Sequence, residues 1–95
     1  MNTLQKQLLD GIITASKKIN SKELIFSTSI PFLYPVSSLK IKDTELSDNY
    51  NIPVGLKGYG EKDLTVLVNE LKLKIIEETE EDPITFEKII KYEIL

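Results

Sequence analysis

The chain has 95 residues and a formal net charge of −3, with twelve Lys, fifteen acidic residues and no Arg, His, Cys or Trp. These absences exclude disulfides, thiolate nucleophiles, imidazole bases and zinc sites built from Cys or His, and they leave only carboxylates for a metal. With 41% hydrophobic and 28% charged residues, the composition is that of a globular protein. We therefore predict one small folded domain over residues 1–95.

Residues 3–19 are predicted to form an amphipathic helix. Their apolar side chains recur at spacings of three and four, at Leu4, Leu8, Ile12, Ala15 and Ile19. Asn2 and Gln5 fit a capping box at its start, and Asn20 fits a left-handed stop at its end. Gly11 costs about 1 kcal/mol relative to Ala in mid-helix, which indicates close packing against another element.

Two strands are predicted next, over residues 24–30 and 36–42. In the first, β-branched and aromatic residues alternate with smaller or polar ones until Pro31 ends the run. In the second, alternate positions share one face of the strand, namely Ser37, Leu39 and Ile41. The connecting stretch IPFLYP, residues 30–35, holds two aromatic side chains between prolines, so it is a candidate binding segment. The alternative is that these side chains cap one end of the core.

Residues 43–60 are predicted to form a long loop, with a possible short strand near Ile52. Its apolar side chains are the expected anchors to the core, at Tyr50, Ile52, Val54, Leu56 and Tyr59. Glycines at 55, 58 and 60 match neither the dinucleotide fingerprint nor the nucleotide-binding P-loop, and no convincing helix follows them. We interpret this stretch as a turn.

Residues 64–76 fit two patterns. A helical stripe is present at Leu64, Leu67, Val68, Leu71 and Ile75, whereas strict alternation with Lys over residues 71–75 favours a strand. We prefer the strand, which requires a β-bulge near Asn69 and Glu70 because the phase of the apolar residues changes there.

The last predicted strand covers residues 84–94, where alternate positions are apolar except for Lys88; the apolar ones are Ile84, Phe86, Ile90, Tyr92 and Ile94. Together with the preceding strand it predicts a long C-terminal β-hairpin. The fold class predicted from these elements is α+β, with one N-terminal helix packed on a four-stranded, mostly antiparallel sheet.

Acidic residues gather at the predicted hairpin tip, at Glu77, Glu78, Glu80, Glu81 and Asp82. Carboxylates are ligands for Ca²⁺ or Mg²⁺, but an EF-hand loop needs alternating acids and a central Gly, and this stretch has no Gly. The sequence therefore predicts a solvated tip with no metal and no cofactor.

The function expected from these features is a non-enzymatic protein-binding module, a small subunit or adaptor in a protein assembly, of phage-like size and composition. The alternative is a small acidic inhibitor of a larger enzyme or nucleic-acid-binding complex, acting by partial nucleic-acid mimicry. Expected partners are another protein or a second copy; direct nucleic-acid binding is not expected because no Arg is present. A membrane partner or a small-molecule ligand is not expected either. The candidate partner-binding residues are Phe32, Leu33, Tyr34, Glu78, Glu80, Glu81 and Asp82.

An intracellular location is expected as well. No apolar run approaches the roughly 18 residues of a membrane span, and the first residues lack the apolar centre of a signal peptide.

Overall fold

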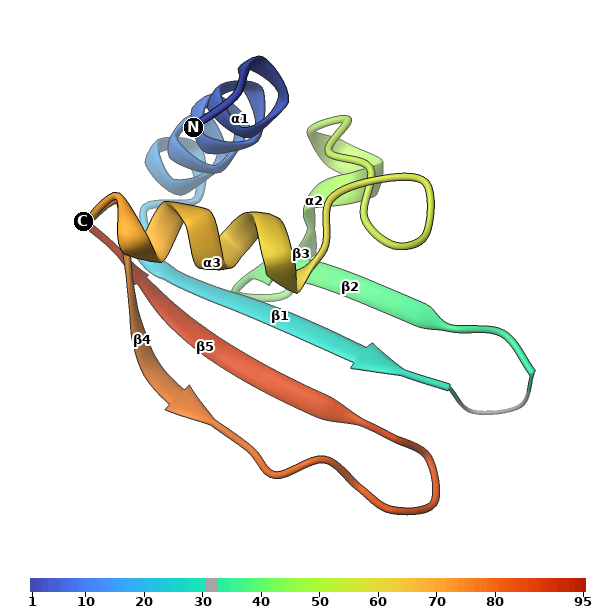
Figure 1. Cartoon of the computed structure of the whole chain (residues 1–95). Helices are drawn as coiled ribbons and strands as arrows, with labels where there is room; N and C mark the ends of the chain where they lie inside the picture. Colours follow the sequence, from blue (N-terminus) through green and yellow to red (C-terminus); the bar gives the residue numbers. More distant parts are fainter. Residues whose placement is uncertain (31–32) are drawn as a thin grey trace.

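A computed structural model describes residues 1–30 and 33–95, which fold into helices on an antiparallel sheet (Figure 1). In chain order the elements are α1 (Thr3–Ile19), β1 (Glu23–Ser29), β2 (Val36–Ile41), β3 (Thr44–Glu45), α2 (Leu46–Asn49), α3 (Glu61–Asn69), β4 (Leu73–Glu78) and β5 (Lys88–Ile94). The five strands lie in the order β3-β2-β1-β5-β4, and every pair of neighbours is antiparallel. The predicted α+β class is confirmed, with β3 as a strand in addition to the four predicted.

One face of the sheet carries the core. In the central strand β1, Phe26 lies opposite Leu39 of β2 and Ile90 of β5, so these three side chains point to the same face. All three are buried, and α1 and α3 both lie over this face (Figure 1). Residues on the opposite face, such as Lys40 and Lys91, are exposed or half-buried. The alternation in each strand therefore decides which side chains meet the helices.

Helix α1 agrees with its prediction at both ends. The Asn2 carboxamide accepts the Gln5 backbone N–H at 2.8 Å, and the Gln5 carboxamide accepts the Asn2 N–H at 3.1 Å, which completes the capping box. Asn20 ends the helix with a φ of 59°. The predicted stripe is buried at Leu8, Ile12 and Ala15, whereas Leu4 is exposed.

The strand preferred for residues 64–76 is wrong over its first half, because α3 occupies residues up to Asn69. The Asp63 carboxylate accepts the Gly60 N–H at 3.0 Å at the start of the helix, directly after the glycine stretch where no helix was expected. Leu64 and Leu67 are buried in the core, and this burial outweighs the strand propensity of the TVLV sequence. Leu71, with a φ of 61°, then reverses the chain into β4.

The β-bulge was also placed wrongly. It lies between Ile75 and Glu77 of β4, not at Asn69 and Glu70. The change of phase that suggested a bulge at 69–70 is the change from helix to strand.

The predicted loop 43–60 contains β3 and α2, and it has no strand at Ile52. Of its expected anchors, Ile52 is buried, and three others are partly buried against the core, namely Tyr50, Val54 and Tyr59. Leu56 is exposed and anchors nothing. An isolated bridge pairs Val54 with Tyr59, and a Cβ at Gly58 would lie 2.3 Å from the Pro53 carbonyl oxygen. This turn therefore requires glycine at position 58.

Gly11 allows α1 and the segment after α2 to approach each other, and this confirms the close packing predicted from its position in mid-helix. A Cβ on Gly11 would lie 2.8 Å from Cδ1 of Ile52.

We expect Gly11→Ala to leave the free energy of unfolding nearly unchanged, because the gain in helix propensity of about 1 kcal/mol is offset by this clash. In an Ile52→Val background, which lacks Cδ1 but keeps Cγ1 at 3.1 Å, the same substitution should be more favourable than in the wild type, by at most about 1 kcal/mol. Urea unfolding of the four proteins measures this coupling, and equal effects of Gly11→Ala in both backgrounds would contradict it.

Candidate functional site

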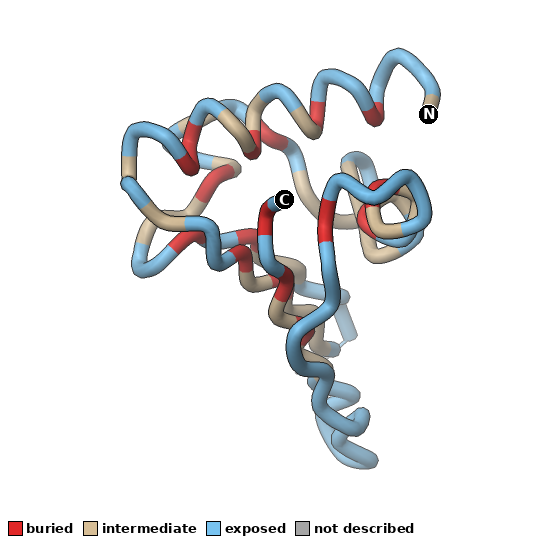
Figure 2. The backbone as a smooth tube through the Cα atoms, turned by 90° about the vertical axis from the view of Figure 1, so that its left-hand side faces the viewer, coloured by how far each residue is buried: buried red, intermediate tan, exposed pale blue. Residues whose placement is uncertain are grey.

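The sheet extends well beyond the layer of helices. Residues 74–87 are all exposed, and in Figure 2 the pale blue end of the β4–β5 hairpin projects away from the helices. The reason lies in the strand sequences: the position after Phe26 on the core face is Thr28, opposite Ser37 and Lys88. Polar side chains end the core there. We call Ile30, residues 33–36 and residues 79–87 the distal end.

Backbone pairing joins the two connections of the distal end. The Ile30 N–H donates to the Thr85 carbonyl oxygen at 2.8 Å. The β1–β2 connection and the β4–β5 connection are therefore neighbours in space, and Figure 1 shows both at the same end of the sheet. The two candidate segments, one aromatic and one acidic, therefore lie at the same end of the sheet and are linked through Ile30 and Thr85.

The distal end concentrates exposed apolar side chains. In the described part of the chain twelve large apolar residues are exposed, and six of them lie here: Ile30, Leu33, Tyr34, Val36, Ile84 and Phe86. Leu33 is 86% exposed and Tyr34 is 76% exposed. The alternative that these two side chains cap the core is therefore wrong. The third candidate of this segment, Phe32, lies outside the described residues.

The predicted strand over residues 84–94 begins only at Lys88, because Asp82 folds residues 82–87 into a loop. Its Oδ1 accepts the backbone N–H groups of Ile84 at 2.8 Å and Thr85 at 3.0 Å. The Phe86 N–H donates to the Asp82 carbonyl oxygen at 2.8 Å, with Phe86 at a φ of 58°. The Thr85 and Ile84 N–H groups lower the pKa of Asp82 because they stabilise the charged carboxylate. Asp82 therefore organises the loop that presents Ile84 and Phe86.

The remaining acidic candidates divide into two kinds. Glu80 and Glu81 are exposed in the β4–β5 connection. Glu78 lies 2.9 Å from the Lys88 ammonium, which also lies 3.1 Å from Glu61 at the start of α3. These two carboxylates raise the pKa of Lys88. Lys88, the residue that breaks the apolar alternation, therefore lies at the boundary between the core and the distal end, where it contacts both α3 and β4.

Tyr92 lies buried behind this charge cluster and is 1% exposed. Burial, followed by the negative charges of Glu61 and Glu78, raises the pKa of Tyr92 to about 12, while Lys88 acts in the opposite direction. The phenol is consequently neutral throughout the physiological range.

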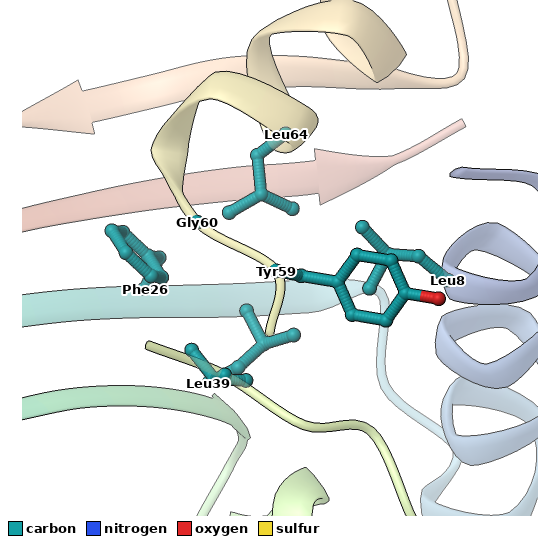
Figure 3. Close-up of a pocket in the computed structure, with 7 residues that line it drawn as sticks. Leu8, Phe26, Leu39, Tyr59, Gly60 and Leu64 are labelled. Atoms are coloured by element: carbon teal, nitrogen blue, oxygen red, sulfur yellow. The ribbon is translucent and has the colours of Figure 1, made fainter. Parts of the chain in front are cut away.

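Two hollows in the described part of the chain lie away from the distal end. One, lined by Leu8, Phe26, Leu39, Val54, Tyr59, Gly60 and Leu64, holds no space for a water molecule. Figure 3 shows the Tyr59 ring packed beside Leu8 with its hydroxyl directed away from Phe26. This hollow is therefore a line of contact between packed core side chains and not a ligand site.

The other hollow has a volume of about 260 Å³ and lies between the starts of α1 and α3, lined by Asn2, Leu4, Pro53, Lys57, Gly58, Tyr59 and Asp63. The Asp63 carboxylate is already occupied there, since it accepts the Gly60 N–H and the Gln5 carboxamide N–H, the latter at 3.2 Å. Nor do three acidic side chains anywhere in residues 1–30 and 33–95 come together in a way that suits a metal ion.

Comparison of the chain with protein-family models, curated proteins and solved structures finds no significant match. Across the described parts of the chain, none of the helices has both the length and the apolar character needed to span a bilayer. The feature of the described residues that most suggests a function is the distal end.

Removing the Asp82 carboxylate should loosen the distal loop without unfolding the protein. In Asp82→Ala the N–H groups of Ile84 and Thr85 lose their acceptor, so we expect faster amide hydrogen exchange at these two residues. Asp82→Asn keeps an oxygen at Oδ1 and should retain most of the protection. Because the pKa of Asp82 is lowered, the protection of the wild type should stay constant as the pH falls through 3.8, the ordinary value for Asp, and should decrease only below it, to the level of the Asn variant, whose acceptor is also neutral. Equal exchange in the Ala and Asn variants would contradict this role.

Tyr92 should make the protein sensitive to alkaline pH. Its pKa rises from 10.0 to about 12 on folding, so the unfolded chain loses the phenol proton first and the free energy of unfolding falls between these values. One pKa unit corresponds to about 1.4 kcal/mol, so the wild type should lose about 2 kcal/mol more than Tyr92→Phe between roughly pH 9 and pH 12. Urea unfolding of both proteins across this range measures the difference. Parallel pH profiles would show that Tyr92 ionises equally in both states.

Proposed function

We propose that the chain is a non-enzymatic protein-binding module, a small subunit or adaptor in a protein assembly, and that the distal end contacts its partner. The observation that supports this most is the Ile30–Thr85 backbone hydrogen bond, since it joins two connections that expose apolar side chains. Single exposed apolar residues are common on protein surfaces, whereas a group of them marks an interaction site.

One part of the distal end, the connection over residues 79–87, is held by its own hydrogen bonds. The Asp82 contacts hold one connection, and the Asp82 N–H donates to the Glu87 carbonyl oxygen at 3.0 Å across its base. Tyr34 and Phe86 supply rigid aromatic surface with few rotatable bonds. An ordered apolar surface loses little conformational entropy on association, which favours affinity.

The charge around the apolar residues defines the chemistry of the partner. Residues 75–87 contain six acidic residues and no Lys, and Lys88 is already paired with Glu61 and Glu78. A complementary partner presents an apolar pocket flanked by Lys or Arg. Such charges accelerate association and fix orientation more than they add affinity.

The same uninterrupted acidity favours a second candidate function, an inhibitor that occupies the basic nucleic-acid-binding surface of another protein. Glu80 and Glu81 would then carry the binding, and nucleic acid would compete with the chain for its target. The two functions differ in which side chains matter most.

Affinity capture from the native host, with variants matched for exposure, tests both functions. Leu33→Ser with Tyr34→Ser should weaken capture of the partner at least about tenfold, because truncation of central apolar anchors typically costs about 2 kcal/mol or more. Leu56→Ser is the control, since Leu56 is 84% exposed but lies outside the distal end. It should capture the partner as the wild type does.

Glu80→Lys with Glu81→Lys separates the candidates. A protein-binding module should show slower association, whereas an inhibitor by mimicry should lose its target entirely. Asp82 is left unchanged because it builds the loop. Capture that survives the Leu33 and Tyr34 substitutions but is abolished by the charge reversal would overturn the proposed apolar contact in favour of mimicry.

A further inference from the structure

The two edges of the sheet are protected differently. Strand β3 at one edge has only two residues, and α2 follows it directly and packs on β2. Strand β4 at the other edge has six residues, and no described segment pairs with its outer side. Residues 74–78 are all exposed, including Ile75 and Ile76. The free edge of β4 is therefore able to accept a further strand.

The β-bulge gives this edge an unusual arrangement of charge. Lys74 pairs with Glu93 of β5, and Glu77 pairs with Lys91. Residues 91 and 93 are two apart in a regular strand and share a face, so Lys74 and Glu77 share that face too. Residues three apart lie on opposite faces of an unbulged strand; the extra residue at Ile76 brings these two onto the same face.

We propose that β4 pairs antiparallel with β4 of a second copy, about a two-fold axis between Ile75 and Ile76. This register places Lys74 opposite Glu77 of the second copy and, by symmetry, Glu77 opposite its Lys74. Residues directly opposite in antiparallel strands must lie on the same face, which the bulge ensures for this pair. Ile75 and Ile76, 43% and 56% exposed, would contact their counterparts at the axis. A two-fold interface requires such a self-complementary surface.

Neighbouring registers lack this complementarity. An axis at Ile75 places Lys74 opposite Ile76. An axis at Ile76 places it opposite Glu78, which pairs with Ile90 and so lies on the core face, whereas Lys74 lies on the opposite face. The order of charges along β4 therefore selects one register.

The dimer would be one continuous sheet with its two distal ends at opposite ends, because antiparallel β4 strands point in opposite directions. This bivalence rests on the proposed function of the distal end, whereas the dimer itself does not. An adaptor of this form would join two copies of its partner.

Sedimentation equilibrium from about 10 µM to about 1 mM tests the dimer, a range suited to the weak affinity of a small interface. The wild type should show a reversible monomer–dimer equilibrium. Lys74→Glu and Glu77→Lys should each weaken it about tenfold or more, because each creates two like-charge pairs across the axis. The double variant should recover to within about threefold of the wild type, since opposite charges face each other again.

Recovery in the double variant cannot arise within one chain. There Lys74→Glu puts a carboxylate beside that of Glu93, and Glu77→Lys puts an ammonium group beside that of Lys91, which is less favourable than the wild type. Ile76→Lys provides a second variant that changes only the bulged, exposed residue, and it should also weaken the dimer about tenfold. Circular dichroism of each variant checks that it is folded.

A wild type that stays monomeric over the whole range would overturn the proposal, as would a folded double variant that fails to recover. Leu33→Ser with Tyr34→Ser should leave the dimer unchanged. If that variant abolishes dimerisation, copies associate through the distal end and the β4 interface is wrong. The proposed dimer can therefore be confirmed or contradicted independently of the result for partner capture.

Discussion

The pairing of β1 with β5 is the constraint on which the rest of the structure depends. It joins segments far apart in the sequence, from Glu23 opposite Glu93 to Thr28 opposite Lys88. In this register Phe26 meets Ile90 under the helices. A slip of one residue would turn Ile89 toward the helices in place of Ile90 and remove the Ile30–Thr85 contact. One register therefore determines both the core and the distal end.

Lys88 marks the boundary between these two parts of the sheet. Its contacts with Glu61 and Glu78 tie β5 to α3 and β4 where the last buried apolar residues end. Exposed ion pairs contribute little to the free energy of unfolding. The main effect of this cluster is therefore to mark where the core ends, not to stabilise the fold. The apolar side chains beyond it are outside the core, and core packing does not explain their presence. This separation is the physical basis for the proposal that they contact a partner.

Local signals were sufficient where neighbouring residues decide the structure. The structure confirms the caps at Asn2 and Asn20 and the alternation in β1 and β2. Each of these features depends only on residues that are close together in the sequence. Helix α3 was missed because the alternating Lys72 and Lys74 belong to the turn and strand behind it. The recognisable signal was Asp63, three residues after Gly60, which begins the helix.

The distal end was predictable only in parts. Composition identified the aromatic stretch and the acidic tip as separate candidates, but their meeting depends on long-range strand pairing, which sequence periodicity does not report. The exposure of Leu33 and Tyr34 follows from where the core stops, again a tertiary property. The role of Asp82 had a local signal, an Asp followed by Pro83 at a turn, that was read only as negative charge.

The central claim, that the two connections form one surface, is tested most directly by the scalar coupling across the Ile30–Thr85 hydrogen bond. Nuclear magnetic resonance of the ¹⁵N,¹³C-labelled chain should detect a coupling between the Ile30 amide nitrogen and the Thr85 carbonyl carbon, with slow hydrogen exchange at Ile30. An Ile30 amide that exchanges as fast as an unpaired one, with no coupling to Thr85, would show that the connections are separate and contradict the account.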